Sequence, residues 1–115
     1  MSRGKPVDRK IIDELIRRIV KVAAPDKLIL FGSGARGEMG PNSDLDILVI
    51  TAGPVHRGRL TEDIYMKLIG IGQAVDVVVV TPEDVERYRD NPYLVIEPAL
   101  RDGRVIYERA APAAG

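Results

Sequence analysis

Two aspartates with a single residue between them, Asp44 and Asp46, stand at the start of the apolar run ILVI. Side chains alternate between the two faces of a strand, so this spacing puts both carboxylates on one face and Leu45 and Ile47 on the other. Two like charges held close together repel each other unless a cation lies between them. A hard divalent ion prefers oxygen ligands, and the pair predicts a site for Mg²⁺ together with phosphate oxygens.

A Gly-Ser turn comes before this pair. Gly32 and Ser33 follow the apolar run KLILF, and a short helix is expected at 35–39. The free N–H groups at a helix start form a ready anion site. Gly32 has no side chain to keep a ligand away, Ser33 adds a hydroxyl, and Arg36 should lie on the same helix face as Ser33. The turn therefore predicts a cradle for phosphate.

A third carboxylate interrupts the run AVDVVVV at Asp76. A charge in the middle of a buried strand is costly unless it is paired or bound to a metal. If this strand lies beside the strand of Asp44 and Asp46, the three aspartates can hold two Mg²⁺ ions about 4 Å apart, the arrangement used for in-line displacement at phosphorus. Asp76 is then the candidate to accept the proton of the attacking hydroxyl.

Simpler interpretations exist for each part of this pattern. An isolated Asp-x-Asp or Gly-Ser pair is common at solvated strand ends, and Arg36 can instead form a structural ion pair. His56, the single histidine, is expected in a solvated loop at 52–59, with a basic lip over the triphosphate or a partner contact as the alternative. The tyrosines are interpreted as half-buried packing residues: Tyr65, Tyr88, Tyr93 and Tyr107.

The elements that must position these residues follow from the apolar periodicity. Helices are expected at 8–24, at 60–72, from a Thr81 cap with Pro82 and Asp84 to about Asn91, and at 93–101. Strands are expected at 27–31, 44–51, 74–81 and, on the edge, 105–108. Helices that alternate with strands predict an α/β fold, with one sheet covered by helices.

The composition bounds the protein further. The 115 residues predict one domain over 1–109 and a disordered tail at 110–115. Lys+Arg and Asp+Glu both number 17, which argues against binding nucleic acid through bulk charge. Cysteine is absent, which excludes disulfides and thiolate metal sites. Without a run of about 20 apolar residues or a signal peptide, the expected location is the cytoplasm.

The string FGSGARGEMGPNSDLDILV resembles the signature of the nucleotidyltransferase superfamily related to DNA polymerase beta, and in particular its minimal nucleotidyltransferases. The resemblance implies a mixed β-sheet flanked by helices and transfer of a nucleoside monophosphate to a hydroxyl. It implies Asp44, Asp46 and Asp76 as ligands of two Mg²⁺ ions, with Asp76 also as base. The implied nucleotide-binding residues are Gly32, Ser33, Arg36 and Ser43.

Minimal nucleotidyltransferases of this kind, MntA-type antitoxins, resemble one half of a toxin–antitoxin pair whose other half is a HEPN-domain protein. The resemblance therefore implies transfer of AMP from ATP to a hydroxyl, expected on a tyrosine, of a HEPN toxin in a heteromeric complex. Two alternatives remain open. One is a non-catalytic module that neutralises its partner by contact, and the other is a small-molecule nucleotidyltransferase.

Overall fold

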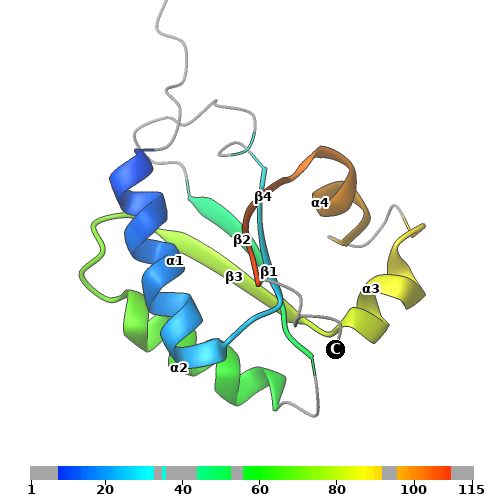
Figure 1. Cartoon of the computed structure of the whole chain (residues 1–115), viewed down its shortest axis with the longest axis horizontal. Coiled ribbons are helices and arrows are strands. Elements are labelled where there is room, and N and C mark those ends of the chain that lie inside the picture. Colours follow the sequence, from blue (N-terminus) through cyan, green and yellow to red (C-terminus); the bar gives the residue numbers. More distant parts are fainter. Residues whose placement is uncertain (1–7, 33–34, 36–43, 53–55, 92–95, 110–115) are drawn as a thin grey trace, which may run out of the picture.

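The computed structural model describes residues 8–32, 35, 44–52, 56–91 and 96–109 (Figure 1). Within these ranges the chain forms, in order, α1 (Arg9–Ala23), β1 (Lys27–Phe31), β2 (Leu45–Ile50), α2 (Arg57–Leu68), β3 (Val75–Val80), α3 (Pro82–Tyr88), α4 (Ile96–Asp102) and β4 (Arg104–Glu108). No described helix is long and apolar enough to cross a membrane.

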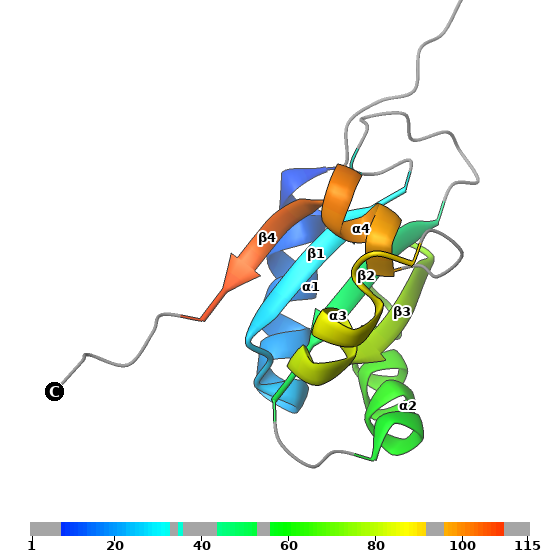
Figure 2. The same ribbon diagram turned by 90° about the vertical axis from the view of Figure 1, so that its right-hand side faces the viewer.

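The four strands form one sheet in the order β3-β2-β1-β4 (Figure 2). β1 is antiparallel to both β2 and β4, whereas β2 and β3 are parallel and are connected through α2. Figure 1 shows α1 and α2 on one side of the sheet and α3 and α4 on the other. The sheet is therefore mixed and flanked by helices, which confirms the expected fold class.

A hydrophobic core fills each side of the sheet. The core under α1 and α2 contains Leu15, Ile19, Leu28, Leu30, Leu45, Ile47, Val49 and Ile64, and the smaller core under α3 and α4 contains Ile29, Leu48, Ile50, Val80, Ile96 and Ala99. Alternate residues of β1 and β2 enter opposite cores, because successive side chains of a strand point to opposite faces. Burial on both faces explains why these two strands read as uninterrupted apolar runs in the sequence.

Arg18 joins α1 to the end of α2. Its guanidinium donates to the backbone oxygens of Lys67 and Ile69, each at 3.1 Å, and to the Glu14 carboxylate at 2.7 Å. The last carbonyls of a helix have no partner within the helix and carry partial negative charge. The cation of Arg18 therefore stabilises the carboxyl end of α2 from outside that helix.

The expected loop at 52–59 is wrong in its second half, because α2 begins at Arg57 rather than at 60. His56 is the N-cap of this helix, and its Nδ1 accepts a hydrogen bond from the Arg59 backbone N–H at 3.1 Å. A histidine can replace the usual capping oxygen here because a neutral ring nitrogen is also an acceptor. The helix ends at Leu68 rather than at 72, and Gly70 and Gly72 follow it, each with φ of +84°.

The capping box expected at the start of α3 is confirmed. The Thr81 hydroxyl accepts from the Asp84 N–H at 3.1 Å, and the Asp84 carboxylate accepts from the Thr81 N–H at 3.0 Å. This helix ends at Tyr88, earlier than expected, and α4 begins at Ile96. The short helix expected at 35–39, apart from Ala35, and the tail expected at 110–115 lie outside the described residues.

Candidate active site

The candidate site lies where β1 ends and β2 begins, at one end of the sheet. Phe31 of β1 pairs with Asp46 of β2, and Asp46 pairs in turn with Asp76 of the parallel strand β3. Paired residues on adjacent strands lie on the same face of a sheet, and such strands are about 4.8 Å apart. The structure therefore brings the Asp46 and Asp76 side chains together on one face.

This face is the one that α3 and α4 cover further along the strands. Leu48 and Val78, two residues beyond the paired aspartates, belong to the core on that side. Asp44 comes directly before the first residue of β2 and is exposed. The Leu45 N–H donates to the Ala74 oxygen at 2.9 Å, which holds the start of β2 against the chain that leads into β3.

Gly32 stands immediately beyond Phe31 and packs directly against the carboxylate of Asp46. Its φ is +73°, a left-handed backbone conformation that residues other than glycine rarely adopt. A Cβ built on Gly32 would overlap Asp46 Oδ2. The backbone conformation therefore favours glycine here, and any larger residue would also have to displace the Asp46 carboxylate.

Asp76 is exposed, and this corrects the reason for which the sequence singled it out. It is the second residue of β3, which is an edge strand, so it lies near a strand end and not in the middle of a buried one. Because this carboxylate is exposed, it pays no desolvation cost that a bound cation would have to offset. The features that still support Asp76 as a candidate site residue are its register with Asp46 and its accessibility to a ligand.

The candidate site fits the implied Mg²⁺ in the chemistry of its donor atoms. The carboxylates of Asp44, Asp46 and Asp76 supply only hard oxygen donors, the type that Mg²⁺ prefers, so their chemistry fits. In the described part of the chain, however, no three or more side chains of histidine, cysteine, aspartate or glutamate lie close enough together to hold a metal ion. The structure thus pairs Asp46 with Asp76 and does not gather Asp44 with them into one metal-holding group.

Three other candidate residues, Ser33, Arg36 and Ser43, lie outside the described residues. Their expected contacts with the nucleotide stay predictions.

Tyr65 is a residue near the site that sequence reasoning missed. Its side chain is exposed rather than half-buried, and its hydroxyl accepts a hydrogen bond at 2.8 Å from the backbone N–H of Val77, the residue after Asp76. The hydroxyl therefore covers part of the outer edge of β3 beside the acid pair. The sequence signal is weak, because nothing local to Tyr65 reports that α2 packs alongside this edge.

The residues around His56 do not form the basic lip considered from the sequence. The His56 ring caps α2, and Arg57 forms an ion pair with Asp84 at 3.0 Å. The hydrogen bond from the Thr81 backbone N–H is the main cause that lowers the pKa of Asp84, and the charges of Arg57 and Arg87 lower it further. This group of residues joins α2 to α3 and has a structural role.

The fold and the arrangement of the candidate site agree with the comparison to known families. Residues 9–110 match the family described as the nucleotidyltransferase domain. The chain therefore belongs to the nucleotidyltransferase domain family, and the resemblance seen in the sequence is confirmed.

Individual proteins and solved structures are also similar to this chain. The chain is 33% identical over 101 residues to a bifunctional uridylyltransferase/uridylyl-removing enzyme of Bordetella pertussis, a match that covers 84% of this chain and only 12% of that enzyme. It is 31% identical over 106 residues to a "putative protein adenylyltransferase" of Methanocaldococcus jannaschii, with 86% of this chain and 71% of that protein covered. A crystal structure of a toxin–antitoxin complex with AMP-PNP contains a chain of the same fold, with a TM-score of 0.56, 22% identity, and 90% of this chain and 75% of that chain covered.

Proposed function

We propose that this chain is a Mg²⁺-dependent nucleotidyltransferase that moves the AMP of ATP onto a hydroxyl of a partner protein. The observation that carries the proposal is the pairing of Asp46 with Asp76 beside a Gly32 that leaves no room for a side chain. Membership of the nucleotidyltransferase domain family supports the reaction class. The relative from Methanocaldococcus jannaschii, named for protein adenylylation, supports a protein as the acceptor.

The proposed roles follow from the chemistry of each side chain. Asp44, Asp46 and Asp76 would hold two Mg²⁺ ions, which when bound neutralise charge on a triphosphate and on the leaving pyrophosphate. The residues proposed to bind the nucleotide are Gly32, Ser33, Arg36 and Ser43. Gly32 would let the backbone come close to the nucleotide. Ser33 would supply a hydroxyl donor, and Arg36 would supply a fixed positive charge.

Asp76 is also proposed as the general base. The acceptor oxygen forms a bond to the α-phosphorus of ATP while the bond between that phosphorus and the bridging oxygen breaks, so pyrophosphate leaves. The proton of the acceptor hydroxyl passes to the Asp76 carboxylate and then to solvent. Because Asp76 is exposed on an edge strand, a hydroxyl carried by a second protein can approach it.

The proposed partner is a HEPN-domain toxin that forms a heteromeric complex with this chain, and the proposed acceptor is one of its tyrosines. A toxin–antitoxin complex holding AMP-PNP is among the proteins that share this fold, which supports both a toxin partner and an adenine nucleotide. We propose the cytoplasm as the location of this chain, because the proposed reaction draws on ATP and modifies a partner made in the same cell.

A second candidate function is neutralisation of the partner by contact alone. The observation that favours it is that the described carboxylates do not gather into a metal-holding group. In this alternative the partner is inhibited without being modified. A third candidate function, transfer to a small molecule, is the weaker alternative because the relative matched over 71% of its own length is named for protein adenylylation.

The experiment co-expresses the full chain with the product of the neighbouring reading frame and incubates the purified complex with Mg²⁺ and each of the four nucleoside triphosphates. Intact-mass measurement of the partner is the readout. We expect one or more AMP additions with ATP, located to tyrosine by peptide mapping. The double variant Asp44→Ala with Asp46→Ala should bind the partner and add nothing.

Three outcomes contradict parts of the proposal. Wild-type labelling by the double variant shows that the metal assignment is wrong. A partner that is inhibited with unchanged mass supports contact alone, and UMP in place of AMP changes the assigned nucleotide.

A further inference from the structure

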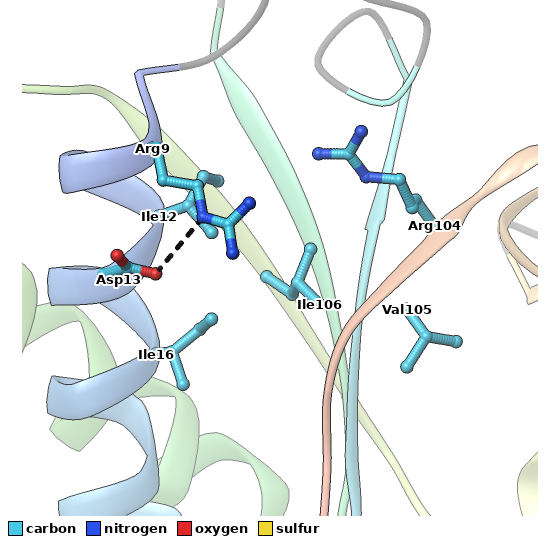
Figure 3. A pocket seen from close by; sticks show the side chains of 7 residues that line it. All are labelled: Arg9, Ile12, Asp13, Ile16, Arg104, Val105 and Ile106. Atoms are coloured by element: carbon cyan, nitrogen blue, oxygen red, sulfur yellow. Dashed lines mark ion pairs between the residues drawn. The ribbon is translucent and has the colours of Figure 1, made fainter.

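A second candidate site lies on the other side of the sheet, between α1 and β4. A cavity of about 240 Å³ opens there, and we name it the α1–β4 groove (Figure 3). Its apolar lining comes chiefly from Ile12, Ile16 and Ile106, and its charged lining from Arg9, Asp13 and Arg104. The groove thus combines an aliphatic floor with a cationic end.

An irregularity in β4 shapes this groove. Tyr107 pairs with Leu28 and Val105 pairs with Ile29, so Ile106 between them is an extra residue without a partner on β1. A bulge of this kind on an edge strand re-aims a side chain. Figure 3 shows Ile106 directed toward α1, on the side where Ile12 and Ile16 lie. The bulge therefore supplies part of the groove floor.

The charges of the groove are unbalanced. Arg9 and Arg104 extend their guanidinium groups into the same end of the cavity (Figure 3). Among the residues that the structure describes, Arg9 has only a long contact with Asp13, at 3.9 Å, and Arg104 forms no ion pair. Two guanidinium groups and one carboxylate in the described lining leave a net positive end, which suits a carboxylate ligand held by bidentate hydrogen bonds.

The groove is separate from the candidate active site. Arg104 pairs with Leu30, whose side chain enters the core under α1 and α2, whereas Asp46 and Asp76 share the face covered by α3 and α4. A ligand in the groove therefore lies across the sheet from the acid pair. An inference about the groove therefore does not depend on the reaction proposed for the acid pair.

The open edge of β4 indicates what kind of ligand fits. β4 ends the sheet and pairs with β1 alone among the described strands, so its outer backbone groups face away from the sheet. A groove between an edge strand and a helix is the geometry in which proteins bind extended peptides, with backbone hydrogen bonds to the edge and alternate side chains in the groove. We propose that the α1–β4 groove binds an extended segment of a partner protein that carries an acidic side chain beside an aliphatic one. The acidic side chain pairs with Arg104 and Arg9, and the aliphatic one contacts the isoleucines.

A displayed library of random decapeptides, selected on the full-length chain, tests this proposal without knowledge of the partner. We expect the enriched peptides to share an acidic residue next to an aliphatic residue. Synthetic copies of these peptides should bind with a dissociation constant raised about tenfold or more by Arg104→Glu, because the variant places like charges together. The matched control is Arg89→Glu, which makes the same charge change on an exposed arginine of the α3 end, outside the groove.

For the variant Asp13→Asn we expect the opposite effect, which is tighter binding of the peptides. The substitution removes the Asp13 carboxylate from the described groove lining and releases Arg9, so the same peptides should bind several-fold more tightly. Circular dichroism establishes that each variant is folded. The proposal is overturned if selection enriches no peptide, if the enriched peptides lack acidic residues, or if Arg89→Glu weakens binding as much as Arg104→Glu. Equal binding by wild type and Asp13→Asn also overturns the role of Arg9.

Discussion

Asp46 and Asp76 are direct register partners on the parallel strands β2 and β3, although 30 residues separate them in the sequence. Both carboxylates therefore lie on the same face, at the end of the sheet where Gly32 approaches Asp46. Two exposed or half-buried acids held side by side gain nothing from each other as anions. This relationship is the basis of the proposed cation site, which the following predictions test.

Asp76→Asn should reduce AMP transfer by a factor of about 100 or more, because a positioned general base contributes about 10²–10⁴ in rate. The side chain is exposed, so the fold should be unaffected. The measurement is the initial rate of partner labelling with radioactive ATP. Asp63→Asn, at an exposed position on α2, is the matched control and should keep the wild-type rate. A wild-type rate for Asp76→Asn would remove Asp76 from the mechanism.

The variants Gly32→Ala and Gly70→Ala separate two effects of replacing a glycine: strain in the backbone and, at Gly32 alone, contact with Asp46. Both glycines have positive φ, at +73° and +84°, so each alanine should lower the free energy of unfolding by about 1–2 kcal/mol. Only at Gly32 would the added Cβ meet Asp46, because nothing lies within 4 Å of a Cβ at Gly70. We expect Gly32→Ala alone to lose AMP transfer. Urea denaturation and the labelling assay measure the two effects, and equal activity in both variants would contradict the role of the close approach.

Arg18→Ala should destabilise the protein by about 1–2 kcal/mol, since charge-assisted hydrogen bonds to the end of α2 are lost and its carbonyls are left to solvent. Arg17→Ala is the control. Arg17 also pairs with Glu14, but it is more exposed and forms no described hydrogen bond to α2, so its loss should destabilise the protein clearly less. Urea unfolding midpoints of the two variants test the difference. Equal losses would show that Arg18 acts only within α1.

Asp84→Asn should make stability less dependent on pH in the acid range. The hydrogen bond from the Thr81 N–H lowers the pKa of the Asp84 carboxyl below its ordinary value of 3.8. A depressed folded-state pKa gives stability that is present above the unfolded value and is lost as pH falls through the folded value. The variant should therefore be less stable than wild type at pH 7, and the difference should shrink below about pH 4. Unfolding at pH 7, 4 and 3 measures this, with the exposed Asp90→Asn as control; a difference that stays constant with pH would contradict the assignment.

The local elements were largely readable from the sequence. The periodicity of α1, the apolar runs of β1 and β2, and the capping box of Thr81 and Asp84 all depend on residues within a few positions of one another. The element ends were less readable. The start of α2 was missed because His56, which is not among the usual capping residues, supplies the N-cap.

The sequence by itself determined the class of fold, the faces of the central strands, and the candidate residues Gly32, Asp44, Asp46 and Asp76, because strand and helix periods and short motifs are local. Only the tertiary structure decided that Asp46 and Asp76 are neighbours, that Asp76 is exposed on an edge, and that the Tyr65 hydroxyl accepts a hydrogen bond from that edge. It also decided the bulge that turns Ile106 toward α1. Strand order and register depend on long-range packing of both faces of the sheet, and no local pattern encodes which strands come to lie together.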